Sequence, residues 1–353
     1  MSRSTIQLSA GNADLAKLAV LATAFIVAAN ILPAFASDYT QRIVLIMALN
    51  SILVVSLGLG SGFTGVFSLG HVGFVAVGAY VSGILSLAPD QKALLLPNLP
   101  HFLATWSASF PIATLAAGIA AALLAQLVGL PLMRLSGHFV SVATMGFLII
   151  VNVMLLNATS FTRGARTFTG VSLDTDLSWS FLWLFITLVV VGRLVHSGVG
   201  RTMRAVRDDS IAASGVGIDV LRARQIAFSV GAFFAGVGGS LYAHYLGSFS
   251  PASFFWPLTI KLIVMLVLGG MGSISGAILG VVLVSVLSEL LQVLEQGVLI
   301  AGVTIPPLFG ASQIALGMIF ILVMIFRPNG LMSGREFSLR GLLQLKPQTL
   351  NGE

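Results

Sequence analysis

The sequence predicts an all-α membrane protein that crosses the bilayer about ten times, and three observations support this fold class. Only 8% of the 353 residues are Asp, Glu, Lys or Arg, whereas soluble domains carry about 25%. Apolar residues make up 57% of the chain and its mean hydropathy is +1.01, more than a soluble fold of this length can bury. The apolar residues also gather in stretches that approach the roughly 20 residues needed for a spanning helix.

Ten apolar stretches are candidate spans. The second and third are separated only by glycine-rich residues, and the eighth is short, carries Lys261 and ends at Gly269-Gly270. We therefore expect eight to ten spans, with broken or re-entrant helices near 58–83 and 257–273. The candidates cover residues 15–36, 41–60, 63–88, 110–133, 139–157, 179–195, 225–247, 257–270, 274–294 and 311–326.

The basic residues predict the orientation, because cytoplasmic loops of membrane proteins carry an excess of Lys and Arg. With ten spans, most of the 18 basic residues fall on one side, which we expect to be cytoplasmic, together with both termini. This predicts a tail at 1–14, a membrane domain at 15–333 with a long cytoplasmic loop at 196–224, and a tail at 334–353. The cytoplasmic set is Arg3, Lys17, Arg134, Arg193, Arg201, Arg204, Arg207, Arg222, Arg224, Arg327, Arg335, Arg340 and Lys346, and the outer set is Arg42, Lys92, Arg163 and Arg166.

The first span has a second interpretation. It ends in Ala34-Phe35-Ala36, which resembles the small-residue cleavage site of a signal peptide. Asp14 and the long polar start are unusual for such a peptide, so we favour an uncleaved helix.

Several function classes are excluded by what the sequence lacks. The chain has no cysteine, which excludes disulfides and thiolate metal sites. It has no G-x-x-x-x-G-K-[ST] phosphate loop, no H-E-x-x-H metal motif and no G-x-S-x-G elbow. The net charge of +6 is not gathered into a basic run, so we expect no nucleic-acid partner. We therefore expect neither cofactor nor metal, and no enzymatic activity in this chain.

The glycine-rich stretch from Gly58 to Gly83 is the first candidate for a transport pathway. Glycine permits a helix break where backbone lines a cavity, and transporters often bind substrate at such breaks. Its polar groups are Thr64, Ser68 and His71. The alternative for the two hydroxyls is helix packing, whereas His71 is a functional candidate because ionisable groups are rare within membranes.

A second set of polar groups lies within residues 137–157. Ser141, Thr144 and Asn152 occur at i, i+3 and i+11, which places them near one face of a helix. Hydrogen bonding between helices, worth about 0.6 kcal/mol each, explains these residues slightly better than substrate contact. We keep Thr144 and Asn152 as pathway candidates.

The loop from 200 to 217 is the third candidate region. It predicts a short amphipathic helix, with Arg204 and Asp208 paired at i and i+4 and an apolar face that includes Met203 and Ala213. The helix should end at Gly215 or Gly217. A helix lying on the bilayer is the alternative, but anionic headgroups would repel the acids at 208 and 209. We therefore favour a docking surface for a cytoplasmic protein.

Several blocks of the sequence resemble the LivM-type permease subunits of the branched-chain amino-acid ABC importers. Each block alone is weak evidence, but together they are specific and extend over about residues 40–333. The blocks are Phe67-Ser68-Leu69-Gly70-His71 with Gly78-Ala79-Tyr80, Gly200-Arg201 through Arg207-Asp208-Asp209 to Gly217-Ile218, Phe228 to Pro251, Leu268 to Ser273, and Phe326-Arg327-Pro328-Asn329-Gly330-Leu331.

The resemblance implies a subunit of a larger assembly in the bacterial inner membrane. It implies a heterodimer with a sister permease, two cytoplasmic ATP-binding subunits that hydrolyse ATP, and a periplasmic substrate-binding protein, with lipid around the helices. The substrate would be leucine, isoleucine, valine or a related small amino acid, carried by alternating access. The motif Ala212-Ala213-x-x-x-Gly217 matches the second half of the E-A-A-x-x-x-G coupling pattern of other importers, although Ile211 replaces its Glu.

These inferences give two sets of site residues. Arg204, Arg207, Asp208, Asp209, Ala212, Ala213 and Gly217 are expected to couple the chain to the ATPase. Thr64, Ser68, His71, Thr144 and Asn152 are expected along the substrate pathway.

Two other functions stay open. Permeases for urea or short-chain amides look much the same, because substrate choice is made largely by the binding protein. A stand-alone ion-coupled carrier is the other alternative, but the sparse charge within the spans argues against it.

Overall fold

The computed structural model describes residues 36–135, 137–295, 299–300, 303–304, 310–327 and 330–332. The expected first span and both expected tails lie outside the described residues, apart from Ala36. Within these residues, the regular secondary structure is helical except for one pair of two-residue strands. In order, the elements are α2 Asp38–Ser61, α3 His71–Ser86, α4 Pro89–Leu95, α5 His101–Ala104, α6 Phe110–Leu132, α7 His138–Asn157, α8 Thr159–Thr162, α9 Leu177–His196, α10 Gly198–Asp208, α11 Ser210–Gly215, α12 Val220–Leu246, η1 Pro251–Phe254, α13 Trp256–Gly269, α14 Ile274–Glu295, β1 Leu299–Ile300, β2 Val303–Thr304 and α15 Ala311–Phe326.

The all-α membrane fold is confirmed, and the predicted number of spans is approximate. Among the described residues, seven helices are long and apolar enough to cross a bilayer. The number is eight if α3 and α4, which meet at an angle of 118°, form one bent span. Each candidate span from residue 41 onward contains a helix, including the shorter α15.

Helix α12 forms the centre of the bundle. Of its spanning window, 78% is buried within the chain, against 28% for α6 and 33% for α7. Around it pack α2, α3 and α6. Glycines make this packing close, because a Cβ on Gly239 would overlap the carbonyl oxygen of Val75, and one on Gly78 would overlap that of Gly236.

Hydrogen-bonding side chains begin several helices where loops enter the bundle. Asp176 accepts from Trp179 N at the start of α9, and Asp219 accepts from Arg222 N at the start of α12. Such caps satisfy amide groups that have no partner within the helix. They position the loops at both ends of the bundle.

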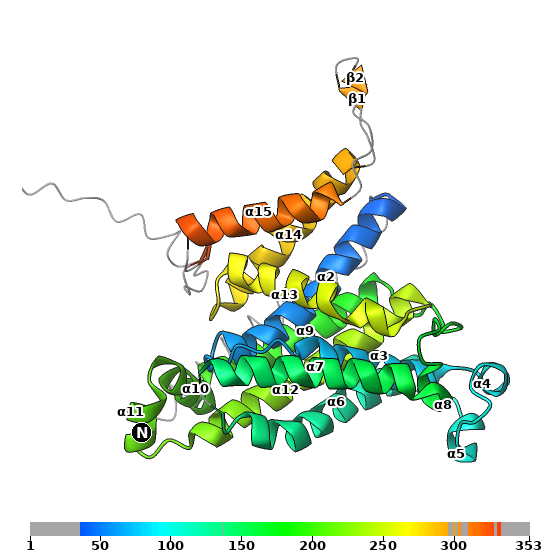
Figure 1. The fold of residues 1–353 in the computed structure, drawn as a ribbon, viewed down its shortest axis with the longest axis horizontal. Helices are drawn as coiled ribbons and strands as arrows, with labels where there is room; N and C mark the ends of the chain where they lie inside the picture. The colour runs from blue at the N-terminus through cyan, green and yellow to red at the C-terminus, as the bar shows by residue number, and fades with distance from the viewer. Residues whose placement is uncertain are drawn as a thin grey trace, which may run out of the picture.

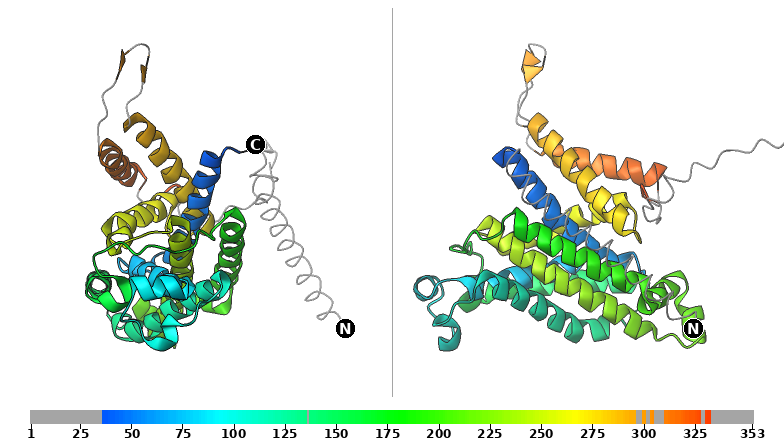
Figure 2. Two further views of the ribbon diagram at one scale, coloured as in Figure 1. Left: turned by 90° about the vertical axis from the view of Figure 1, so that its right-hand side faces the viewer. Right: turned by 180° about the vertical axis from the view of Figure 1, so that it is seen from behind.

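The two ends of the bundle carry different elements. Helices α10 and α11 lie at one end, and α4, α5 and α8 lie at the other (Figure 1). We call these the α10 end and the α4 end. Helices α13, α14 and α15 pack on one side, where α2 contacts both α13 and α14 (Figures 1 and 2).

The expected helix breaks occur at glycines. Helix α2 ends at Ser61 and α3 begins at His71, so residues 62–70 form a non-helical segment at the α10 end, here called the break. Helix α13 has 14 residues and is followed by Gly270 and Gly272, both with positive φ. Only glycine adopts such angles without strain.

Candidate functional site

The break at 62–70 is held by the start of α7. The amide of Leu69 donates to Thr144 Oγ1 at 3.1 Å, and Ser141 Oγ donates to the carbonyl of Phe67 at 2.8 Å. Gly70 lies so close to the backbone of Thr144 that a Cβ would overlap its carbonyl oxygen. Thr144 therefore acts on the break through hydrogen bonds and close backbone packing.

Thr64, Ser68 and His71 are buried beside this contact. Thr64 Oγ1 donates to Gly60 O at 2.7 Å, within its own turn. His71 Nε2 lies 2.9 Å from Ser56 Oγ, whose proton goes to the carbonyl of Leu53, so the ring nitrogen donates to Ser56. The Ser68 hydroxyl has no partner among the described residues.

The cavity beside these side chains is small. Thr64, Ser68, His71 and Arg224 line a space of about 10 Å³, which is enough for about one water molecule. An amino acid does not fit there in this conformation. The structure therefore shows the break closed.

Asn152 lies apart from the other pathway candidates. Its side-chain amide donates to Pro251 O, at the start of η1, at 3.3 Å. Asn152 lies eight residues after Thr144, which corresponds to about 12 Å along α7. The structure thus brings Thr64, Ser68, His71 and Thr144 together, and it does not bring Asn152 to them.

The predicted amphipathic helix is two helices. Helix α10 ends at Asp208 and α11 begins at Ser210, because Asp209 Oδ1 accepts from the amides of Ile211 and Ala212 at 2.8 and 3.0 Å. Asp209 therefore caps α11 and bends the segment. The apolar face is as predicted, with Met203, Val206 and Ala213 buried.

The expected pairing of Arg204 with Asp208 is wrong. Asp208 pairs with its neighbour Arg207, at 2.9 Å, and Arg204 donates to Val195 O at the end of α9, at 3.1 Å. An exposed pair at i and i+4 is worth only a few tenths of a kcal/mol, so the unsatisfied carbonyl of a helix end competes successfully for the guanidinium.

Arg207 connects α10 to the break. Its Nη1 donates to Gly62 O at 3.4 Å, and its stem packs against Gly65. A Cβ on Gly272, in the turn after α13, would lie 3.0 Å from the same guanidinium. One side chain therefore contacts both glycine-rich turns at the α10 end.

The tip of this segment exposes apolar side chains. Ile211 is 84% exposed and Val216 is 79% exposed, with Ala212 also exposed between them. Gly217 follows with a φ of 85°. An apolar patch on an extramembrane helix is typical of a protein contact.

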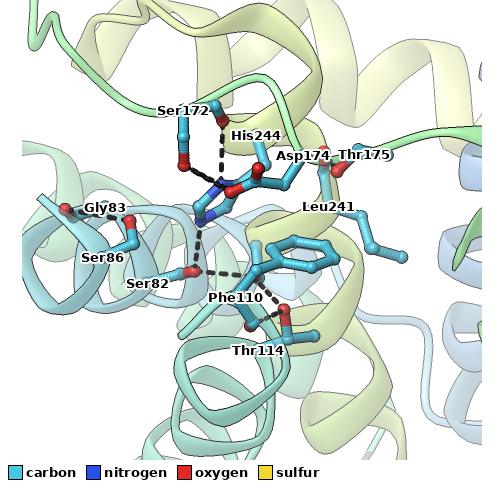
Figure 3. A network of polar contacts seen from close by, with 11 residues as sticks. Ser82, Gly83, Ser86, Phe110, Thr114, Ser172, Asp174, Thr175, Leu241 and His244 are labelled. Carbon is cyan, nitrogen blue, oxygen red and sulfur yellow. Dashed lines mark hydrogen bonds and ion pairs between the residues drawn. The ribbon is translucent and has the colours of Figure 1, made fainter. Parts of the chain in front are cut away.

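The sequence reasoning missed a buried polar network near the α4 end (Figure 3). Ser82 of α3, Thr114 of α6 and His244 of α12 are each fully buried. Ser240 Oγ lies 2.6 Å from Ser82 Oγ and 2.8 Å from Thr114 Oγ1, and Ser82 Oγ lies 3.1 Å from His244 Nε2. The chain of hydroxyls joins α3, α6 and α12 near the α4 end of the bundle.

His244 connects that network to the loop before α9. Its Nδ1 lies 3.0 Å from Ser172 O, which can only accept, so Nδ1 carries a proton. Asp174 Oδ2 lies 3.6 Å from the same nitrogen, and Ser172 Oγ donates to Asp174 (Figure 3). The sequence did contain a signal for this network. Ser240 and His244 lie at i and i+4 within one apolar span, and polar residues in a span need hydrogen-bond partners.

The comparisons with known proteins identify the family. Residues 39–327 match the family described as the permease component of the branched-chain amino acid transport system. The chain belongs to this family. The resemblance to LivM-type permeases that the sequence indicated is thereby confirmed.

The relatives of this branched-chain amino acid permease differ in how much of the chain they match. The high-affinity branched-chain amino acid transport permease LivM of Escherichia coli K12 is 30% identical over 94% of the chain and 77% of its own length. The LivM protein of Salmonella typhimurium LT2 is 30% identical over 87% of the chain and 73% of its own length. The E. coli K12 permease LivH matches 37% of the chain at 29% identity, over 48% of its own length. No solved structure matches the chain.

The network around His244 should stabilise this permease. We expect His244→Leu to lower the free energy of unfolding by about 2 kcal/mol, because Ser172 O loses its donor and Ser82 loses an acceptor in a buried site. Thermal unfolding of the purified protein in detergent measures the change. Ser86→Ala is the matched control, since among the described residues that hydroxyl bonds to Gly83 O of its own helix and to no other helix. A His244→Leu variant as stable as the wild type would show that the network contributes nothing.

Proposed function

We propose that this chain is the membrane-spanning permease subunit of an ATP-driven importer for leucine, isoleucine, valine or a related small amino acid. It lies in the bacterial cytoplasmic membrane with both termini and the loop 196–224 in the cytoplasm, and residues 15–333 form the permease domain. A sister permease completes the pathway, two ATP-binding subunits hydrolyse ATP, and a periplasmic binding protein delivers the amino acid. The names of the LivM and LivH relatives support a transport system with two kinds of permease.

The α10–α11 segment is the observation that carries the proposal. It projects at one end of the bundle, exposes Ile211 and Val216, and buries its other face against the chain. Arg207 on the same segment contacts the break. A partner that moves α10 and α11 therefore has a direct mechanical connection to the pathway residues.

The closed break supports alternating access. Thr144 and Arg207 hold residues 62–70 from two sides, and the space beside His71 is about the size of one water molecule. For an amino acid to pass the α10 end, these contacts must separate. ATP binding and hydrolysis on the partner subunits would supply the free energy by moving α10 and α11 through their docked surface.

Transport by the reconstituted complex tests the proposal. The chain is coexpressed with the sister permease, the ATP-binding subunits and the binding protein from the same operon, and the complex is placed in proteoliposomes. We expect copurification with the ATP-binding subunits and uptake of labelled leucine that requires ATP. Urea and acetamide should not compete with leucine. Uptake by the chain alone, without ATP and abolished by collapsing the membrane potential, would instead establish an ion-coupled carrier.

A further inference from the structure

A large hollow lies between α13, α14 and α15, away from the break. Its volume is about 590 Å³, which is within the range of about 300–1,000 Å³ found for small-molecule sites. The cavity beside His71, at about 10 Å³, is too small for an amino acid, whereas this hollow is large enough. Its walls include Ile260, Lys261, Val264, Val284, Ser288 and Leu316.

The packing of α13 against α14 places Lys261 well within the membrane-spanning part of these helices. Helices α13 and α14 run antiparallel, with Gly269 packed on Gly276 and Gly280 packed on Met265. This register continues to Lys261 beside Val284 and Ser288, which both line the same hollow. Those two positions are about 15–21 Å from the start of α14 at 1.5 Å per residue, in a hydrocarbon layer about 30 Å thick.

The ammonium group of Lys261 makes no hydrogen bond or direct ion pair within the part of the chain that the structure describes, although the carboxylate of Glu289 interacts with it electrostatically from a greater distance. Glu289, one turn beyond Ser285 on α14, accepts from the hydroxyl of Tyr39, and Ser288 donates to Val284 O of its own helix. A charge at this depth is costly unless it meets a partner or a polar pathway. The rim also carries the exposed Gln292.

We propose that Lys261 binds the carboxylate of the transported amino acid in this hollow. The apolar walls at Ile260, Val264, Val284 and Leu316 then contact the aliphatic side chain. The proposal rests on the proposed function and names the position of the substrate within it. A carboxylate side chain of a neighbouring subunit has the same chemistry, and the experiment separates these two sources.

Cysteine protection tests the proposal, because the natural chain has no cysteine. Gln292→Cys places a thiol at the rim, and the whole transporter complex is reconstituted in nanodiscs. A maleimide labels the thiol, and a denaturing gel separates this chain from its partners. We expect leucine to slow the labelling, and leucinamide, which lacks the carboxylate, to have little effect. Retained ATP-driven uptake by the Gln292→Cys complex shows that it is folded.

The charge of Lys261 is then removed in the Gln292→Cys background. We expect Lys261→Met to raise the leucine concentration for half-protection by about tenfold or more, as for loss of a charged hydrogen bond, and Lys261→Arg to restore most of the protection. Arg42→Met is the matched control, since it removes an exposed positive charge near the outer end of α2.

Three results would overturn the assignment. Equal protection by leucine and leucinamide would show that the carboxylate is not recognised. Unchanged protection in Lys261→Met would show that another group binds it. Loss of the sister permease from the Lys261→Met complex would show that Lys261 pairs with a carboxylate of that subunit. ATP-dependent leucine uptake by the wild-type complex is measured in parallel, and its failure would refute the proposed function itself.

Discussion

Gly239→Val should prevent the bundle from forming. A Cβ at this position would overlap the carbonyl oxygen of Val75. The α3 backbone is held there because Ser82, about two turns farther along α3, is bonded to Ser240, the residue next to Gly239. Overpacking of a close-packed interior costs about 1–3 kcal/mol when side chains can adjust. Here the obstacle is backbone at the centre of the bundle, so we expect a larger loss, seen as aggregated protein on size-exclusion chromatography in detergent.

Gly192→Val is the matched control for this prediction. Gly192 lies within α9, and a Cβ there meets nothing within 4 Å. The two variants share the same change in helix propensity, which is below 1 kcal/mol. A Gly239→Val protein that elutes and unfolds like Gly192→Val would show that α3 and α12 do not need their close contact.

The spans and their breaks could be predicted because they depend on local sequence. An apolar stretch of about 20 residues has few alternatives to a membrane helix, and the glycines around Gly62 and Gly270 mark both interruptions. The contacts that place Gly239 against Val75 could not be predicted in this way. They depend on which helices meet, and one sequence carries no direct record of that.

A helical wheel predicted which face of each site helix the polar residues occupy. It did not predict how far apart they lie along the helix or where a helix ends. Thr144 and Asn152 share one face of α7, but about 12 Å of helix separates them, so only Thr144 reaches the break. The wheel also treated 201–217 as continuous. The capping side chain of Asp209 ends α10, and an acid followed by two helix-compatible residues was a local signal for that end.

Charged and ionisable residues within the spans were only partly interpretable. His71 was predicted as a pathway residue because it lies in a glycine-rich stretch. In the structure it lines a cavity that is too small for an amino acid. His244 is bonded to Ser82, which lies on a different helix. Lys261 lines a hollow whose other walls come from α14 and α15. Residues that are far apart in the sequence create these sites, so composition and spacing could not locate them.

Ile211→Asp should abolish ATP-driven uptake while leaving the permease folded. Ile211 is 84% exposed and is the second residue of α11, where a carboxylate is favourable because of the helix dipole. The change therefore does not weaken the segment that carries it. In a docked interface the same carboxylate would be buried without a partner, which is strongly unfavourable. We expect affinity for the ATP-binding subunits to fall by about 100-fold or more, as for the loss of a central apolar contact.

Leu94→Asp provides the comparison, because Leu94 is 80% exposed on α4 at the opposite end of the bundle. Both variants replace an exposed aliphatic side chain with the same charge, so they differ chiefly in which surface they alter. Copurification with the ATP-binding subunits and ATP-dependent leucine uptake are measured for each. If Ile211→Asp retains both and Leu94→Asp loses both, the ATP-binding subunits do not dock at α10 and α11. The orientation inferred from the basic residues would then be reversed, because the α4 end would face the cytoplasm.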